Sequence, residues 1–320
     1  MKSSMKAGVF SAALLATAAT APAAMAGDAR FFGLDNVRVS AGLGYSAIKA
    51  NELVWDDDGS RLSQLVWESK VPVVTFGIKA DLGAGWTLAG NAAIKAGNNG
   101  KMKDFDWLEP FATGKGDNDW THRSVHPNSP LDSYVNIDLA IGRNYRIGSQ
   151  TVSNIHGGVQ YTNAGWNSRG GSYIYSEKGF RKDTGTLPAG ERAISYKQSY
   201  SGVFIGNELT TKVDNWTLSG LARLGVTLHS KDVDHHWQRD LRFKESFERA
   251  AFVVIGGRAE YAFSERTSLV ASAQYQKYLR RNGDIAATKI STGASDGIAK
   301  DGAAADLRTM TVGLAVQTRF

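Results

Sequence analysis

Apolar and polar residues alternate along much of this chain, with the period of two that belongs to β-strands. The pattern recurs at 86–96, 135–144, 216–229, 253–263 and 268–276. It is clearest in the last segment, where one face carries Met310, Val312, Leu314, Val316, Thr318 and Phe320. No segment beyond residue 26 holds the ~18 consecutive apolar residues that a membrane-spanning helix needs. We therefore expect an all-β protein.

The first 26 residues have the features of a secretory signal peptide. Lys2 and Lys6 provide the positive start, 9–21 is apolar, and Ala24-Met25-Ala26 is a small-residue cleavage site. A membrane anchor is the alternative, but the apolar run is short and rich in alanine. We expect residues 1–26 to be removed and 27–320 to form one domain. The chain has no cysteine, so neither disulfides nor a thiol nucleophile contribute.

An exported chain of this kind is either a soluble sandwich or an outer-membrane barrel, and three features favour the barrel. The chain ends on the aromatic Phe320, which closes an alternating strand. Aromatic residues such as Trp86 and Trp216 lie near strand ends, where the membrane interface is expected. Short turns, such as 213–215, alternate with long polar stretches. Those stretches lie at roughly 50–61, 98–130, 163–191, 229–249 and 281–306.

Five long hairpins predict a transmembrane antiparallel β-barrel of about ten strands in the bacterial outer membrane. Each strand with its connection is much longer than the ~9–11 residues needed to cross lipid, so long extracellular hairpins should project beyond it. Loss of two lysines with the signal peptide lowers the formal charge from +6 to +4. This modest excess suits an anionic surface such as lipopolysaccharide and does not indicate nucleic-acid binding.

Two acidic clusters lie in the long polar stretches. On an extended backbone, Asp232, Asp234 and His236 point to one side, and an Asp two residues from a His can orient an imidazole base. The segment Asp117-Asn118-Asp119-Trp120 repeats this spacing with two carboxylates. Carboxylates on one strand face repel unless they share a proton or bind a water, a cation or a peptide group. A solvated charged loop is the alternative for both clusters.

Two other kinds of catalytic site are disfavoured. Adjacent residues such as His235 and His236 diverge on a strand, and there is no His-Glu-x-x-His motif, so no metal site is expected. No Gly-x-Ser-x-Gly motif occurs, which argues against a serine hydrolase of that type.

Seven blocks resemble the omptin family of outer-membrane proteases, and they fall in order across nearly all of the mature chain. They are 61–67, Asp117–Trp120, His126-Pro127, 169–176, 177–181, 188–198 and Asp232–His236. The resemblance implies a ten-stranded barrel with an endopeptidase site in an extracellular groove. It also implies that peptides or proteins with basic residues are the substrates.

The resemblance implies roles for four residues. Asp234 and His236 match the family's Asp–His couple, and Asp117 and Asp119 match its Asp–Asp couple across the groove. The implied mechanism is attack by an activated water without a covalent intermediate. His236 would take the water's proton, Asp234 would fix the imidazole tautomer, and Asp119 with Asp117 would position the water.

Specificity follows from the same resemblance. Glu52 and Asp232 match the two acids of the family's first specificity pocket, which would select Arg or Lys before the scissile bond. The segment between Asp119 and His126 is shorter than in the best-known members. A strict preference for two consecutive basic residues is therefore expected to be relaxed.

Omptins also resemble one another in needing lipopolysaccharide, which basic residues on the outer wall bind. The matching positions here are Val159, Tyr161, Asn163 and Ser199, none of them basic, and a further basic position of the family falls near Arg249. Whether this lipid binds weakly, elsewhere or not at all stays open, and no other cofactor is expected. The rival function is a non-enzymatic barrel, an adhesin or a pore, whose acidic loops bind cationic partners.

Overall fold

The computed structural model describes residues 37–320, which form a 13-stranded antiparallel sheet. The predicted signal peptide, and residues 27–36 of the predicted domain, lie outside the described residues. No helix among the described residues is long and apolar enough to cross a membrane. The strands are β1 (Val37–Trp55), β2 (Arg61–Gly83), β3 (Trp86–Lys95), β4 (Lys101–Asp106), β5 (His122–His126), β6 (Leu131–Arg146), β7 (Thr151–Tyr175), β8 (Asp183–Val213), β9 (Trp216–His236), β10 (Leu241–Phe247), β11 (Ala251–Ala262), β12 (Thr267–Lys289) and β13 (Ser295–Arg319).

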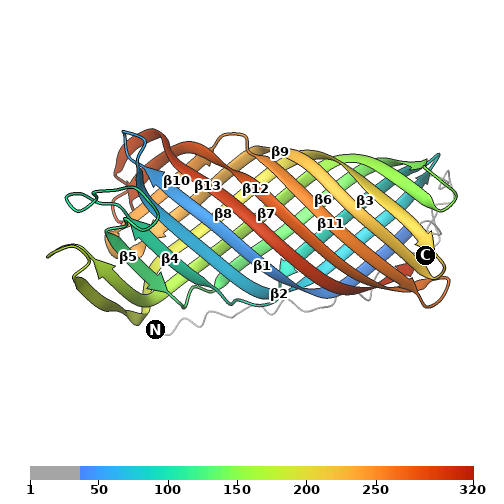
Figure 1. Ribbon diagram of the computed structural model, residues 1–320, viewed down its shortest axis with the longest axis horizontal. Helices are drawn as coiled ribbons and strands as arrows, with labels where there is room; N and C mark the ends of the chain where they lie inside the picture. The colour runs from blue at the N-terminus through green and yellow to red at the C-terminus, as the bar shows by residue number, and fades with distance from the viewer. Residues whose placement is uncertain (1–36) are drawn as a thin grey trace, which may run out of the picture. The chain divides into compact units, whose positions relative to one another are not determined.

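The sheet closes into a barrel because β1 pairs with both β2 and β13 (Figure 1). At three positions in the barrel wall, one long strand is replaced by two shorter strands placed end to end. These pairs are β3 with β4, β6 with β5, and β11 with β10. Among the described residues, ten strands therefore surround the barrel at any level, which confirms the prediction of about ten. The first two interruptions, at 96–100 and 127–130, are rich in Gly, Asn and Pro, which leave a β-ladder readily.

The connections differ between the two ends of the barrel. At one end they are short, at 84–85, 147–150, 214–215 and 263–266. The connections at the other end are 56–60, 107–121, 176–182, 237–240 and 290–294, beside β4, β5 and β10 at the left of Figure 1. The two longest connections of the barrel, 107–121 and 176–182, are at this end, which we call the end with the long connections. Most of the predicted long polar stretches are strand rather than loop. β8, for example, runs for 31 residues, far beyond the ~9–11 needed to cross lipid.

A band of exposed apolar side chains, the apolar belt, covers the outer face toward the end with short connections. It includes Leu43, Tyr45, Ile78, Ile94, Leu139, Ile141, Val159, Ile205, Leu224, Leu228, Ile255, Leu269, Met310, Leu314 and Val316. Such a band is the surface that an outer-membrane barrel presents to lipid. The belt ends near Tyr45 on β1 and Leu228 on β9, so the strands continue as a rim beyond the lipid.

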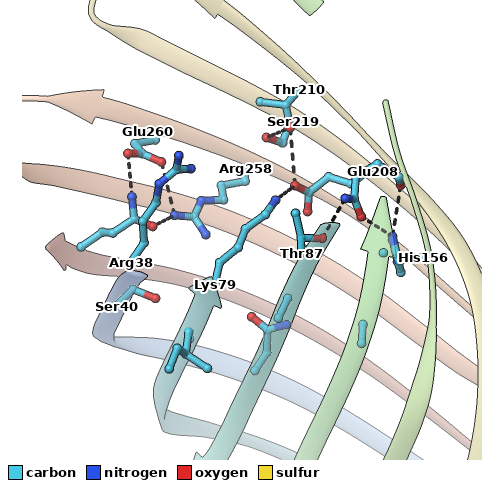
Figure 2. A pocket seen from close by; sticks show the side chains of 18 of the residues that line it. Arg38, Ser40, Lys79, Thr87, His156, Glu208, Thr210, Ser219, Arg258 and Glu260 are labelled. Carbon is cyan, nitrogen blue, oxygen red and sulfur yellow. Dashed lines mark hydrogen bonds and ion pairs between the residues drawn. The ribbon is translucent and has the colours of Figure 1, made fainter. Parts of the chain in front are cut away.

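The lumen at the level of the belt is filled by paired charges (Figure 2). Lys79 Nζ lies 2.8 Å from Glu208 Oε1, and Arg223 Nη1 lies 3.1 Å from Asp138 Oδ1. The remaining cavity is only about 100 Å³. Along β8 the inward side chains pass from Glu208, through the buried aromatic rings of Tyr200 and Tyr196, to Ile194 at the rim. The barrel is thus a packed scaffold for its rim and not an open tube.

Candidate active site

A groove of about 720 Å³ opens at the end with the long connections. β4, β5, β7, β8, β9 and the single-turn 3-10 helix η4 (Trp237–Arg239) provide its walls. The titratable side chains that line it include Asp104, Asp106, His126, Tyr175, Asp183, His236 and Arg239. The groove lies beyond the apolar belt, so its chemistry is accessible to water.

β9 brings the Asp–His couple together as predicted. The strand is paired on both sides at this level, with β8 and β10, and its alternation turns Asp232, Asp234 and His236 inward. His236 Nε2 lies 2.6 Å from Asp234 Oδ2. Because a carboxylate only accepts, Nε2–H is the donor, and the lone pair of the neutral ring is then on Nδ1. The ring packs edge-on against Phe243, with centroids 5.4 Å apart.

The charges around His236 favour its protonated form. Burial by itself lowers the pKa of His236, but the carboxylates of Asp234 and Asp104 outweigh burial and raise it above its ordinary value. His236 is therefore an imidazole of increased basicity with a fixed tautomer. Those are properties of a general base.

The second pair of groove carboxylates is Asp104 and Asp106, which the sequence analysis did not identify. Alternation in β4 gives them one face, together with the buried Met102. Burial is the main reason that the pKa of each is raised, and repulsion from Asp106 raises that of Asp104 further. Charge on His236 opposes these shifts in both. Two such groups next to an imidazole can share a proton and hold a water molecule.

Asp117 and Asp119 lie elsewhere. The prediction that they share a strand face is wrong, because both are in the loop between β4 and β5. The Asp117 side chain is 91% exposed and pairs with Arg61 Nη1 at 2.9 Å. Asp119 Oδ2 accepts a hydrogen bond from the Gly116 amide at 2.9 Å, which closes a tight turn. Neither residue lines the groove.

The sequence contains Asp-x-Asp-Trp twice, at 104–107 and at 117–120. This repetition explains why the sequence prediction assigned the two groove carboxylates to the wrong segment. Two local signals separate the copies. The segment from Lys101 to Asp106 contains neither glycine nor proline, so it can continue a strand. Before Asp117, Gly114 and Gly116 indicate a turn.

Glu52 and Asp232 are brought together as predicted, and a third acid joins them. We call Glu52, Asp232 and Glu245, from β1, β9 and β10, the acidic pocket; their exposed fractions are 1%, 2% and 3%. The Tyr196 hydroxyl donates to Asp232 Oδ2 at 2.7 Å. Within residues 37–320, Glu52 Oε2, Asp232 Oδ1 and both oxygens of Glu245 receive no hydrogen bond from an amide, hydroxyl or cationic donor, and Glu245 is within carboxyl–carboxyl hydrogen-bond reach of Asp232 and Glu52. Alternation over Leu241–Phe247 could have identified Glu245 as inward-facing.

Crowding makes these acids difficult to ionise. Burial, then repulsion by neighbouring carboxylates, raises the pKa values of Glu52 and Glu245 well above their ordinary values. Burial raises the pKa of Asp232 to about 7, against the Tyr196 hydrogen bond. Unpaired buried oxygens are costly to desolvate, so a cationic side chain that entered the pocket would be strongly favoured.

The groove also contains a serine–histidine contact that the sequence analysis did not identify. Ser124 Oγ lies 2.8 Å from His126 Nε2, and His126 Nδ1 lies 2.5 Å from the Gly170 carbonyl oxygen. Since a carbonyl only accepts, Nδ1 carries the proton and Nε2 accepts from Ser124. Among the residues that the structure describes, no carboxylate acts on this imidazole, and burial lowers the pKa of His126.

The positions matched to a lipid-binding wall carry no basic residue. Val159 and Tyr161 are exposed within the apolar belt. Asn163 is buried, and its Nδ2 donates to Ser199 Oγ at 2.8 Å. Over residues 37–320, no group of three or more His, Asp or Glu side chains has a geometry that could hold a metal ion.

Comparison with known proteins gives a consistent set of relatives. The family model described as the Omptin family matches residues 33–320. A plasminogen activator of Yersinia pestis is 28% identical over 295 residues, covering 89% of this chain and 90% of the relative. Protease 7 of Escherichia coli K12 is 28% identical over 288 residues, covering 84% of this chain and 86% of the relative. The crystal structure of the outer membrane protease OmpT from Escherichia coli superposes with a TM-score of 0.82 at 25% identity, covering 90% of this chain and 98% of that one.

Proposed function

The chain belongs to the omptin family of outer-membrane proteases, and we propose that it is an endopeptidase cleaving after arginine or lysine in an extracellular groove. The observation that carries this proposal is the coincidence of two features at one end of the barrel. One is an imidazole whose Nε2 is held by Asp234, leaving Nδ1 as a base. The other is the acidic pocket, whose buried oxygens suit a cationic side chain.

The proposed reaction is hydrolysis by an activated water. His236 Nδ1 takes a proton from the water as its oxygen attacks the peptide carbonyl carbon, and Asp234 stabilises the resulting imidazolium. The Asp104–Asp106 pair, which shares a proton, holds the water and donates a hydrogen bond to the developing oxyanion. The C–N bond then breaks as the imidazolium returns its proton to the leaving amine. We assign the Asp–Asp couple to Asp104 and Asp106 because they line the groove with His236, whereas Asp117 and Asp119 do not.

Substrate selection is proposed to depend on the acidic pocket. An arginine guanidinium can bridge two carboxylates with paired hydrogen bonds, and lysine can satisfy them as a point charge. Either cation lowers the mutual repulsion of Glu52, Asp232 and Glu245. A neutral side chain would leave this crowded group of acids without a cationic donor, and an unsatisfied buried polar group costs ~1–3 kcal/mol.

The groove is proposed to face the exterior of the cell. In outer-membrane barrels the periplasmic turns are short and the extracellular connections long. The groove lies at the end with the long connections, beyond the apolar belt. A pore is disfavoured because paired charges fill the lumen. An adhesin differs from a protease in that its binding would survive the loss of His236.

The test is cleavage of an internally quenched peptide by refolded protein, with and without lipopolysaccharide. The peptides would carry Arg, Lys or Gln before the scissile bond. We expect turnover of the first two peptides and its loss in His236→Ala. A fluorophosphonate probe, which labels activated serines, should leave Ser124 unmodified; labelling that abolishes turnover would indicate a Ser124 nucleophile instead. A folded barrel without turnover in either lipid condition would favour the binding protein.

A further inference from the structure

One strand beside the groove has an edge that is not paired. Residues 194–213 of β8 pair with β9, whereas 183–193 pair with β7 alone. Within residues 37–320, no strand besides β7 and β9 pairs with β8. The hairpin of β7 and β8 continues past the end of β9 (Figure 1), so this upper part of β8 presents backbone N–H and C=O groups to solvent.

The register of the strands shows how far this edge lies from the catalytic base. Ile194 of β8 pairs with His236. Residues 188–191 bulge out of the ladder, because Arg192 and Leu187 pair with positions only two residues apart on β7. Leu187 therefore lies only about four strand residues, or ~13 Å, beyond the level of His236.

The short helix η4 covers part of the unpaired edge. Gln238 Nε2 donates to Glu191 Oε2 at 3.3 Å, and the Arg192 guanidinium lies 4.9 Å from the centre of the Trp237 ring. The part that remains beyond the bulge is 183–187, which we call the free edge. All five of its residues are exposed or half-exposed, so a further strand can approach them.

The free edge belongs to the groove that contains His236. Asp183 and Leu187, at its two ends, both line that groove. The Asp183 carboxylate accepts hydrogen bonds from the amides of Glu177 and Lys178, at 2.9 and 2.7 Å, which fixes the turn between β7 and β8. The turn and the pairing with β7 together hold the free edge in an extended form before any ligand arrives.

Two aromatic rings stand beside the free edge. Tyr175 and Tyr173 pair with Asp183 and Gly185, line the groove and stack with ring centroids 4.5 Å apart. A side chain at Gly185 would collide with the Tyr173 ring, so glycine permits this ring to lie across the neighbouring strand. Alternate side chains of a strand added at the free edge would face this aromatic wall.

We propose that the free edge binds the substrate as an added β-strand, starting about four residues from the scissile bond. This inference rests on the proposed endopeptidase function, because the free edge and His236 line one groove. The same continuity favours a substrate segment over a second copy of the chain as the occupant. Backbone hydrogen bonds recognise an extended segment whatever its sequence, while Tyr173 and Tyr175 contact every second side chain. The enzyme therefore selects exposed, extended segments of a protein in addition to a basic residue.

The first test compares peptides on the refolded wild-type barrel. A short quenched peptide with Arg before the scissile bond is extended by about six residues on its N-terminal or its C-terminal side. We expect one of the two extensions to increase kcat/KM at least about tenfold, because it adds several backbone hydrogen bonds. N-methylation of every second amide in that extension should cancel the gain. Methylation of the intervening amides should leave it within about threefold, because only alternate N–H groups of a strand face its neighbour.

The second test locates the bound peptide on the protein. His236→Ala should bind the extended peptide without cleaving it, so hydrogen–deuterium exchange can be measured on the complex. We expect alternate amides of the free edge to exchange at least about tenfold more slowly with the peptide than without it. The connection 290–294, between β12 and β13, should exchange unchanged. The peptide with the inhibitory methylation pattern should protect neither segment.

The outcomes separate this proposal from the function on which it rests. Cleavage of the short peptide with no gain from either extension, or with equal effects of the two methylation patterns, would overturn strand addition and leave the endopeptidase intact. If even the short peptide were not cleaved, the endopeptidase function would fail and this proposal with it. Protection of the free edge that depends on protein concentration and not on peptide would assign the edge to a second copy of the chain.

Discussion

At the scale of single residues, the surroundings of each carboxylate distinguish its role. Asp234 is buried and hydrogen-bonded to an imidazole, while Asp104 and Asp106 line the groove as a coupled pair. Glu245 is buried among other acids. Asp117 projects into solvent, where an ion pair such as that with Arg61 contributes little. Spacing along the chain does not separate these environments.

The two Asp-x-Asp-Trp segments provide matched variants. Asp104→Asn should lower kcat by at least about 100-fold, because it removes the charge and the shared proton beside His236. Asp117→Asn, the same change in the second segment, should leave kcat within about threefold of wild type. Steady-state cleavage of the quenched Arg peptide measures both. Loss of activity in Asp117→Asn and Asp119→Asn, with Asp104→Asn unaffected, would instead assign the catalytic Asp–Asp couple to Asp117 and Asp119.

The pKa of His236 predicts the pH dependence of cleavage. A base must be unprotonated, and the carboxylates of Asp234 and Asp104 outweigh burial to raise this pKa above its ordinary ~6.5. The kcat/KM should therefore increase with pH through an apparent pKa above ~6.5. In Asp104→Asn the residual activity should show this rise at lower pH, because one of the stabilising charges is gone. If the apparent pKa were unchanged or higher in Asp104→Asn, Asp104 would not be one of the charges that stabilise protonated His236.

At the scale of elements, strands that continue past the apolar belt provide the rigid part of the site. β9 carries Asp232, Asp234 and His236 on one face and is paired on both sides. The loop at 107–121 is held differently. Arg181, in the connection after β7, donates from Nε and Nη2 to the Trp120 carbonyl oxygen at 2.8 and 2.6 Å. Its guanidinium also lies 3.6 Å from the centre of the Trp120 ring.

Arg181→Ala should loosen this loop without unfolding the barrel. The lost charge-assisted hydrogen bonds and cation–π contact together contribute ~2 kcal/mol, which corresponds to roughly 30-fold faster amide exchange where local opening is limiting. Hydrogen–deuterium exchange of the segment 117–121 measures the effect. Lys178→Ala, an exposed change in the same connection, serves as the control. Equal exchange in the two variants would mean that Arg181 does not hold the loop.

At the scale of the whole molecule, the filled barrel makes a crowded acidic pocket possible. The buried aromatic side chains include Trp67 and Tyr196, whose stacked rings have centroids 5.6 Å apart, and the Tyr196 hydroxyl donates to Asp232 of the pocket. The barrel cannot relax easily to separate the acids, because strands on both sides fix their positions. The folded protein therefore favours the protonated form of these carboxylic acids, and it loses stability when they ionise.

This cost predicts how stability varies with pH. Glu52, Asp232 and Glu245 have raised pKa values in the folded state, so the folded protein binds more protons than the unfolded chain above pH ~4. Stability should then fall as pH rises toward 7 and beyond. Glu245→Gln removes one of the repelling charges, so this variant should lose less stability than wild type as the pH rises. Its apparent melting temperature should exceed that of wild type by an amount that grows by roughly 3 °C between pH 5 and pH 8. A constant difference across that range would show that Glu245 does not ionise against its neighbours.

The sequence by itself determined the barrel, the number of strands and the face of β9. Alternation with a period of two is a local property that follows from strand geometry, so it can be read without knowing which strands pair. The same local rule fixed Asp232, Asp234 and His236 on one face. Proximity across the barrel is a different quantity, because it depends on register and on where a strand gives way to a loop. Only the tertiary structure decided that Asp104 and Asp106, not Asp117 and Asp119, line the groove with His236. It likewise brought Glu245 to Glu52 across nearly two hundred residues of chain.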